Sequence, residues 1–450
     1  MKIQRITKFS SESLFYFYEK DFAKFKERFY QSDLGKIYLA IPWKKLISSF
    51  SVKESRKGPR SYFSPQGKLA LMFLKNYSGM SDRKVMEQLN GNVEWQFFCG
   101  IYLKEQRLTN YKIISEIRSE LASKLDIEKL QKVLMSYWLP YIKNPGHITV
   151  DATCYESEVR YPTNVKLLWE SIDWVVGQSI LLHKYLNLKQ PRSKYNKWKT
   201  RYIIYSKKRR KSKKERVVLT RGLLNLLDKF IRILDDVISS YEIELPSRYY
   251  KRIETIKEIY RQQYNLFTKG EKPKNRIVSI SKSYIRPIVR GKEVKSVEFG
   301  AKVNKIQIDG INFIEHISFD NFNEGTRLIS SVSLAEWLTG VKTSILGGDG
   351  IYATNKNRKF ISFRKIQTDF KQKGRKGKYY EQKQTLSKII TKERASRLEG
   401  SFGKEKENYH LRKVKAKTKL NEILWIFFGI HTANALEIGR RMSQSNRQIA

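Results

Sequence analysis

Residues 295–320, KSVEFGAKVNKIQIDGINFIEHISFD, constrain the fold more than any other stretch of this 450-residue chain. Apolar and polar residues alternate along both halves, and Asp309 with the following glycine stands between them. This pattern predicts a β-hairpin, because Asp-Gly favours the tight turn that joins two antiparallel strands. A shorter alternating stretch, HITVDATCYESEVRYP at 147–162, predicts another strand with Asp151 in its middle. The fold must therefore contain a sheet assembled from distant parts of the chain.

Helical periodicity fills most of the sequence between and after these strands. We expect helices at 164–186, 220–245, 323–340 and, for the most part, 385–413, with short strands at 342–350 and 359–365. This order predicts a mixed α/β sheet in which the first strand lies beside the strand that ends at Asp349. Asp151 and Asp349 then approach each other, and the last helix brings Glu399 to the same edge.

Residues 1–145 are predicted to be mostly helical. Within 64–101, a first helix ends at Gly79 and Ser81 caps a second helix, so that the pair resembles a helix-turn-helix. The candidates for DNA contact are the two bases in the first turn of the second helix, Arg83 and Lys84. A small helical hairpin with no role beyond the core is the alternative.

The charge of the chain is strongly one-sided. It carries 89 Lys and Arg residues against 44 Asp and Glu residues, a net charge of +45. Nucleic acid is the usual partner for such an excess, because each base placed on a phosphate releases a condensed counterion. An anionic membrane surface is the alternative, but the sequence has no run of about 18 apolar residues for a spanning helix. The apolar stretch at 423–436 is predicted to be a buried core helix.

One basic segment stands out within this excess. Eight of the ten residues 207–216 are Lys or Arg. We expect an arm that follows DNA phosphates, and the alternative is a solvated loop. The residues that we assign to the arm are Lys207, Lys208, Arg209, Arg210 and Lys211. The two cysteines, Cys99 and Cys154, form neither a disulfide framework nor a zinc spacing, so a reducing cytoplasm fits.

Three carboxylates gathered at one sheet edge would suit the cleavage of a phosphodiester bond. Two Mg²⁺ ions about 4 Å apart can supply the nucleophilic water and neutralise the leaving oxygen. Mg²⁺ prefers hard oxygen ligands, and Mn²⁺ can replace it. Without a cation the carboxylates would raise one another's pKa. Gly348 and Gly350 would leave room for a metal and a DNA backbone beside Asp349.

Several segments together resemble the DDE transposases of bacterial insertion sequences, in the family-five-like group. They are ITVDATCYESEVRYPTNVKLLWE, SVEFGAKV, HISFDNFNEGT, GGDGIYATNKNRKF and RASRLEGSFGKEKENYHLRKVKAKT. The similarity runs from about residue 60 to residue 436. It implies a ribonuclease-H-like mixed sheet with flanking helices. It also implies an N-terminal helical DNA-binding domain at 1–145, a catalytic domain at 146–162 and 296–450, and a helical, basic insertion at 163–295.

The resemblance also implies roles for single residues. Asp151, Asp349 and Glu399 would form the DDE triad and hold two Mg²⁺ ions. Lys406 follows Glu399 by two helical turns and would reach a DNA phosphate. The family places an arginine four residues before the glutamate, where this chain has Ala395, so the neighbouring Arg394 and Arg397 are the candidates. Asp309 in the hairpin turn and Asp320 at a strand end are the rival acids.

The function implied is a DNA transposase that binds the terminal inverted repeats of its element. Such an enzyme cuts with water and then joins the freed 3′-hydroxyl to target DNA. Two ends must meet, so we expect a homodimer on DNA, located in the bacterial cytoplasm with the nucleoid. The alternatives are a non-catalytic DNA-binding protein, such as a decayed transposase or a repressor, and a ribonuclease-H-like nuclease without strand transfer.

Overall fold

The computed structural model describes residues 4–5, 19–54, 61–103, 106–289, 297–374 and 380–449. The chain divides into two compact units, Met1–Glu158 with Ala301–Ala450, and Val159–Gly300. The first unit contains both the sheet and the N-terminal helices, which the sequence suggested as a domain of their own. The second unit begins and ends within a few residues of the expected insertion.

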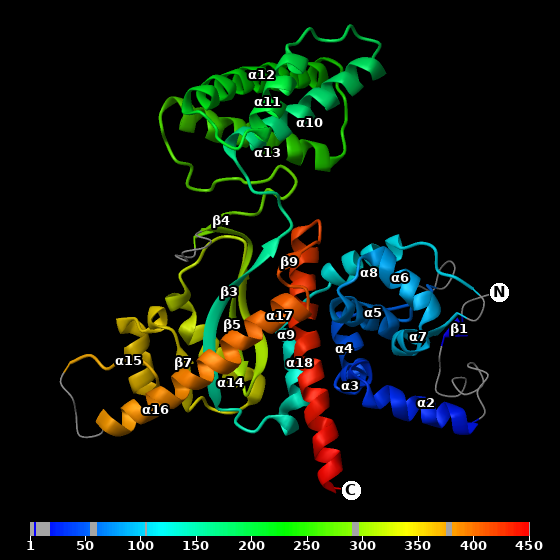
Figure 1. Cartoon of the computed structure of the whole chain (residues 1–450), viewed down its shortest axis with the longest axis vertical. Helices are drawn as coiled ribbons and strands as arrows, with labels where there is room; N and C mark the ends of the chain where they lie inside the picture. The colour runs from blue at the N-terminus through cyan, green and yellow to red at the C-terminus, as the bar shows by residue number, and fades with distance from the viewer. Residues whose placement is uncertain are drawn as a thin grey trace. The chain divides into compact units, whose positions relative to one another are not determined.

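A mixed sheet forms the centre of the first unit (Figure 1). The strands lie in the order β4-β5-β3-β7-β8, with β6 paired to β5 and β9 to β3; β4 and the first residues of β5 belong to the second unit. Their bounds are β3 His147–Ser157, β4 Pro287–Val289, β5 Val297–Ile308, β6 Ile311–Ser318, β7 Ile345–Gly348, β8 Gln367–Thr368 and β9 Lys413–Val414. The predicted hairpin is confirmed: β5 and β6 are antiparallel, and Asp309 and Gly310 turn between them with φ of 48° and 83°. Strand β7 is parallel to both β3 and β8.

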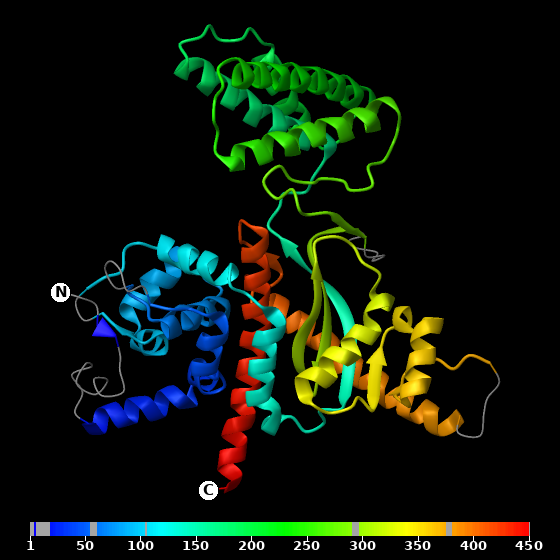
Figure 2. The same cartoon turned by 180° about the vertical axis from the view of Figure 1, so that it is seen from behind.

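Helices cover both faces of this sheet. Helix α16 (Tyr380–Glu393) continues through a π-helical segment, η4 (Arg394–Glu399), into α17 (Gly400–Asn408). This long helix crosses one face in Figure 1. Helix α14 (Leu328–Thr339) lies on the other face, in front of the sheet in Figure 2, and ends at Gly340 as predicted.

The strand predicted at 359–365 is wrong, because residues 359–364 belong to helix α15 (Asn355–Arg364) and Lys365 caps its end. The alternation in KFISF imitates a strand, yet only Ile361 is buried, and Phe363 is 84% exposed. Thr354 starts the helix, since its side chain accepts a hydrogen bond from a backbone N–H of the first turn. Local capping therefore decides this segment, and the two-residue β8 that follows supplies the outer strand.

The N-terminal helices pack on α18 (Lys419–Ile449), which also contacts β6. The predicted helix pair is present as α5 (Pro65–Ser78) and α6 (Asp82–Gly91). Gly79 adopts a φ of 62° between them, and a Cβ there would lie 1.7 Å from His410 Nε2. The other helices are α2 Glu19–Gln31, α3 Asp33–Leu39, α4 Trp43–Phe50, α7 Val93–Cys99, α8 Lys112–Ala122 and α9 Ile127–Trp138.

The apolar stretch at 423–436 lies within α18 and is largely buried, as predicted. Across the described part of the chain, no helix combines the length and the apolar character that a membrane crossing requires.

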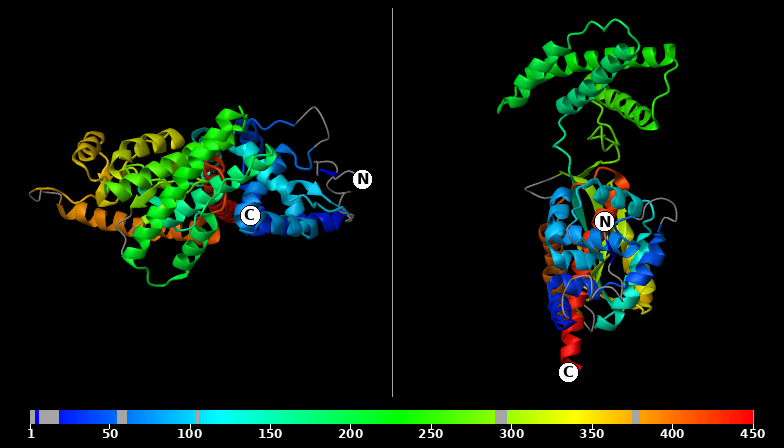
Figure 3. Two further views of the ribbon diagram at one scale, coloured as in Figure 1. Left: turned by 90° about the horizontal axis from the view of Figure 1, so that it is seen from above. Right: turned by 90° about the vertical axis from the view of Figure 1, so that its right-hand side faces the viewer.

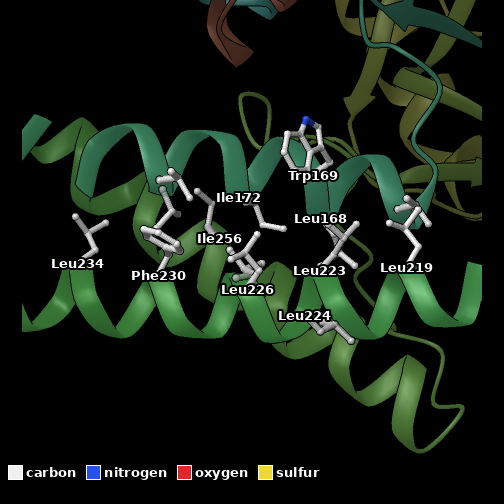
Figure 4. Close-up of a cluster of buried hydrophobic side chains, with 14 of the residues drawn as sticks. Leu168, Trp169, Ile172, Leu219, Leu223, Leu224, Leu226, Phe230, Leu234 and Ile256 are labelled. Atoms are coloured by element: carbon white, nitrogen blue, oxygen red, sulfur yellow. The ribbon is translucent and has the colours of Figure 1, made fainter. Parts of the chain in front are cut away.

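The second unit is a helical bundle (Figure 3). It contains α10 Asn164–Tyr185, α11 Tyr195–Lys207, α12 Lys213–Ser240 and α13 Ser247–Thr268. Figure 4 shows its core, where Leu168 and Ile172 of α10 lie against Leu223 and Leu226 of α12. Burial of this apolar stripe holds the bundle together.

Candidate active site

Strands β3 and β7 bring two of the predicted acids to adjacent positions. The strands are parallel, and Val150 is the register partner of Gly348. Asp151 is the next residue on β3, and Asp349 is the next residue after β7. The prediction that these two strands are neighbours in the sheet is therefore confirmed.

The glycines before Asp349 serve close packing. A Cβ on Gly347 would lie 2.7 Å from Ile390 of α16, and a Cβ on Gly348 would lie 3.0 Å from Cγ2 of Val150. The interpretation of Gly348 as space for a ligand is thus wrong, because protein atoms occupy that side. Gly350 does face open space, since a Cβ there would meet no atom of the described residues within 4 Å.

Asp151 lies in surroundings that disfavour the ionised form of its carboxyl group. Burial is the main cause of a pKa raised from 3.8 to about 6, and the charges of Glu324 and Asp349 raise it further. The backbone N–H of Ala152, 2.7 Å from Oδ1, and the charge of Arg394 act in the opposite direction. A half-buried carboxylate beside a second carboxylate is an arrangement that a bound cation would stabilise.

This raised pKa predicts that Asp151 destabilises the fold at neutral pH. The folded protein binds the proton more tightly than the unfolded chain, so stability falls as the pH rises from about 4 to about 6. Asp151→Asn should increase the free energy of unfolding by up to about 3 kcal/mol at neutral pH and change it little near pH 4. Chemical denaturation at both pH values measures this gain. The exposed Asp320→Asn is the control, and equal or lower stability of Asp151→Asn at neutral pH would contradict the account.

Asp349 is exposed and begins the short helical turn η3 (Gly350–Tyr352). Its Oδ1 accepts a hydrogen bond from the N–H of Gly350 at 2.6 Å. The turn η2 (Glu324–Arg327) packs against η3, because Asn357 donates to the carbonyls of both Gly325 and Tyr352. Asp349 therefore stands at the start of a turn that is tied to the neighbouring turn η2.

Glu324 is an acid near the pair that the sequence did not single out. Its carboxylate pairs with Lys302 of β5 at 2.8 Å, and its side chain is only 14% exposed. Its charge acts on Asp151, as described above. The segment HISFDNFNEGT contains it, but nothing in its local spacing separates it from an ordinary turn residue.

Arg394 and Asp369 form a second pair beside the aspartates. Arg394 Nε lies 3.7 Å from Asp369 Oδ2, and the other oxygen of Asp369 accepts from the N–H of Gly348 at 3.0 Å. Burial raises the pKa of Asp369. Asp369 follows β8 as Asp349 follows β7, so a correct placement of that strand in the sequence would have revealed it.

Glu399 ends the π-helical segment η4 and is exposed. The segment contacts β3, the strand of Asp151. Among the residues that the structure describes, no group of three His, Cys, Asp or Glu side chains is close enough to hold a metal ion. The structure thus brings Asp151 and Asp349 together without closing a triad with Glu399.

The predicted DNA contacts differ in their surroundings. Arg397 pairs with Asp309 at 3.2 Å and Glu393 at 3.0 Å, away from the aspartate pair. Lys406 is half-buried in α17. On α6, Arg83 pairs with Glu87 while Lys84 is exposed. The basic segment between α11 and α12 is exposed throughout, and one of its members pairs with Glu215 at 2.8 Å; it consists of Lys207, Lys208, Arg209, Arg210 and Lys211.

The fold and the site together define a mixed α/β protein with two aspartates on adjacent parallel strands. Comparison with known protein families identifies two domains in the chain. A transposase domain (DUF772) matches residues 24–120, and a transposase DDE domain matches residues 346–427. Both matches support an insertion-sequence DDE transposase, which confirms the resemblance seen in the sequence motifs. No curated protein and no solved structure matches the chain.

Proposed function

We propose that the chain is a Mg²⁺-dependent DNA transposase that binds the terminal inverted repeats of its insertion sequence, cleaves the DNA and joins the ends to target DNA. The observation that carries this proposal is the adjacency of Asp151 and Asp349 on β3 and β7. The matched DDE domain begins on β7 and includes Asp349 and Glu399. DNA is the partner that transposase domains imply, and the net charge of +45 supports it.

The residues present fit a divalent cation. Asp151 and Asp349 offer hard oxygen ligands, and burial together with the charge of Asp349 disfavours the ionised form of Asp151. A bound Mg²⁺ pair would supply an activated water and neutralise the leaving oxygen. Asp151 would hold the cation from the strand, and Asp349 would hold it from the exposed turn. Glu399 is the proposed third ligand, carried by the helix that crosses β3.

The sheet supports a ribonuclease-H-like core as the resemblance implies. An antiparallel pair, β5 and β6, lies next to β3, and the parallel strands β7 and β8 follow on its other side. The proposed acids then come from the central strand, its parallel neighbour and a covering helix. Such an edge is where ligands bind in open α/β sheets.

Arg394 is the arginine that we assign to this site. In an α-helix, residues four apart stand one above the other, whereas in a π-helical turn residues five apart do so. The π-helical segment spans Arg394 to Glu399, which are five residues apart. Arg394 is therefore placed one turn before Glu399, as an arginine at 395 would be in an α-helix. The charge of Arg394 also acts on Asp151, where it could hold a DNA phosphate.

A pair of variants tests this assignment. Arg394→Ala should lower the DNA cleavage rate by roughly 10-fold or more with end binding retained, since one charge-assisted phosphate contact is lost. Arg397→Ala is the matched control, because Arg397 already pairs with Asp309 and Glu393, and its cleavage rate should stay within a few-fold of the original. Cleavage assays on end DNA measure both. Equal losses, or the larger loss in Arg397→Ala, would reject Arg394.

The basic residues outside the acidic edge are proposed to bind DNA. Arg83 and Lys84 on the second helix of the α5–α6 pair would contact the terminal repeats, and Lys406 would contact a phosphate beside the acids. The segment Lys207–Lys211 would follow the DNA backbone. A homodimer on DNA would bring two ends together, in a cytoplasm where the nucleoid is accessible.

Mapping of DNA breaks and joins tests the proposal. The full chain is incubated with Mg²⁺ and with the DNA that flanks its own gene, together with a target plasmid. Cuts at the element's ends followed by joined products are expected. Cuts without joining would favour a ribonuclease-H-like nuclease. Binding without cuts would favour a non-catalytic DNA-binding protein.

A further inference from the structure

A fully buried polar cluster lies under the helix that carries Glu399. Lys305 is 0% exposed and Glu405 is 1% exposed, and Nζ of the lysine lies 2.8 and 2.7 Å from the two carboxylate oxygens. The Tyr155 hydroxyl donates to the same carboxylate, and the side-chain amide of Asn312 donates to it at 2.9 Å. The ring of Phe402 covers the lysine, 4.3 Å from Nζ to the centroid. We call these residues the Glu405 cluster.

The Glu405 cluster ties one helix residue to three strands. Tyr155 lies on β3, Lys305 on β5 and Asn312 on β6, whereas Glu405 lies on α17. Asn312 is itself fixed, because its backbone exchanges hydrogen bonds with the side chain of Asn434 on α18. Each donor approaches the carboxylate from a different element. All of these hydrogen bonds can form together only at one rotation of α17 about its axis and one position along that axis.

The position of the cluster connects it to the proposed catalytic edge. Tyr155 is four residues after Asp151 on the same strand, so both side chains point to the same face of the sheet. Glu405 follows Glu399 by six residues and precedes Lys406 by one. The other end of the helix is held where Ile390 lies over Gly347 and Arg394 approaches Asp369.

Stability alone does not account for a buried ion pair of this kind. Removing two charges from water costs several kcal/mol, and apolar residues of similar volume often stabilise a core as well or better. An apolar contact would, however, allow the helix to slide or rotate. Directional hydrogen bonds to one carboxylate do not, which makes the cluster suited to fixing the register of the helix.

We propose that the Glu405 cluster is a positioning device that sets the rotation and height of α17, and thereby where Glu399 and Lys406 stand relative to Asp151 and Asp349. The helix is anchored at Arg394, where the π-helical segment η4 begins, and at Glu405, six residues after that segment ends. That segment accommodates one more residue per hydrogen-bonded turn than an α-helix does. The rotation at Glu399 therefore depends on the downstream anchor. This proposal rests on the proposed transposase function.

Two hydroxyl deletions on one strand provide a matched test. Tyr155→Phe removes the hydroxyl that donates to Glu405 of α17. Ser157→Ala removes a hydroxyl from the same face of β3 that donates to the buried Glu422 of α18 at 2.5 Å. Both variants should lower the melting temperature by similar amounts. Only Tyr155→Phe should speed amide hydrogen exchange in 400–408, by about 10-fold.

The same pair is then compared in cleavage assays. Tyr155→Phe should raise the Mg²⁺ concentration for half-maximal cleavage several-fold, and Ser157→Ala should leave it unchanged. Equal exchange in 400–408 and equal Mg²⁺ dependence in the two variants would overturn the proposal. The exchange experiment needs no activity, so absence of cleavage by the wild-type chain would reject the transposase function while the exchange result still decides the role of the cluster.

An apolar replacement separates positioning from stability. The double variant Lys305→Met with Glu405→Leu removes both buried charges together, so its melting temperature should fall less than that of Glu405→Leu alone, which leaves the charge of Lys305 unpaired. It should nevertheless exchange faster in 400–408 and cleave at least 10-fold more slowly at the wild-type Mg²⁺ optimum. A stable double variant with normal exchange and cleavage would show that the cluster does no more than fill the core.

Discussion

Asp349→Asn and Asp151→Asn should each reduce Mg²⁺-dependent cleavage of end DNA by about 10³-fold or more, while end binding is retained. The amide keeps the size of the side chain but removes the charge that a Mg²⁺ ion requires, and such an ion is worth several kcal/mol of transition-state stabilisation. Binding should persist, because the basic residues proposed to contact DNA lie on other elements. Gel-shift and cleavage assays on the same DNA separate the two quantities.

Asp320→Asn is the control for this experiment. Asp320 is an exposed aspartate of the same unit, and the sequence had left it as a rival acid. Its cleavage should match that of the wild-type chain. Cleavage retained by Asp349→Asn, or lost equally in Asp320→Asn, would contradict the assignment of the aspartate pair.

The third acid is decided by a comparison of Glu399→Gln with Glu324→Gln. The family resemblance assigns the role to Glu399, which the structure leaves exposed at the end of η4. The charge of Glu324 raises the pKa of Asp151, but the carboxylate of Glu324 is already paired with Lys302. We expect the larger loss of cleavage in Glu399→Gln. The reverse order would move the third ligand to η2.

Removal of charge from the basic segment of the helical unit should weaken DNA binding strongly. The triple variant Lys207→Ala, Arg209→Ala and Arg210→Ala removes three exposed bases of this segment. If each contacts a phosphate, the slope of log affinity against log salt should fall by about 3, and affinity at about 0.1 M salt should fall on the order of 10²-fold. Fluorescence anisotropy over a salt series measures both quantities.

The charge-matched control lies in the same unit. Lys269→Ala, Lys272→Ala and Lys274→Ala remove three exposed lysines that follow α13, the last helix of the bundle in chain order. This variant removes the same number of positive charges as the first, but it should change the slope of log affinity against log salt little. Equal slopes in the two triple variants would show that 207–211 is a solvated loop.

Local chemistry explains which parts of the fold could be predicted. The Asp309 turn, the glycine after α14 and the serine cap of α6 each act through a few neighbouring residues, so the sequence shows them directly. The pairing of β3 with β7 could also be predicted, since few connections are possible for that order of elements. The error at 359–365 has the same basis, because apolar alternation suggested a strand where the Thr354 cap forms a helix.

The features that escaped prediction depend on distant partners. Lys305 and Glu405 are one hundred residues apart, and neither has a local pattern that predicts a buried ion pair. Asp369 reaches Arg394, and Glu324 acts on Asp151, only after the strands and turns have assembled. Each of these contacts becomes visible once tertiary packing is known.

Metal binding by the aspartate pair is the central claim, and calorimetric titration with Mn²⁺ tests it most directly. The full chain, bound to its end DNA, is titrated as wild type, Asp151→Asn, Asp349→Asn and the control Asp320→Asn. The account predicts saturable binding in the wild type and in Asp320→Asn, and its loss in both variants of the pair. Equal Mn²⁺ binding in all four proteins would contradict it.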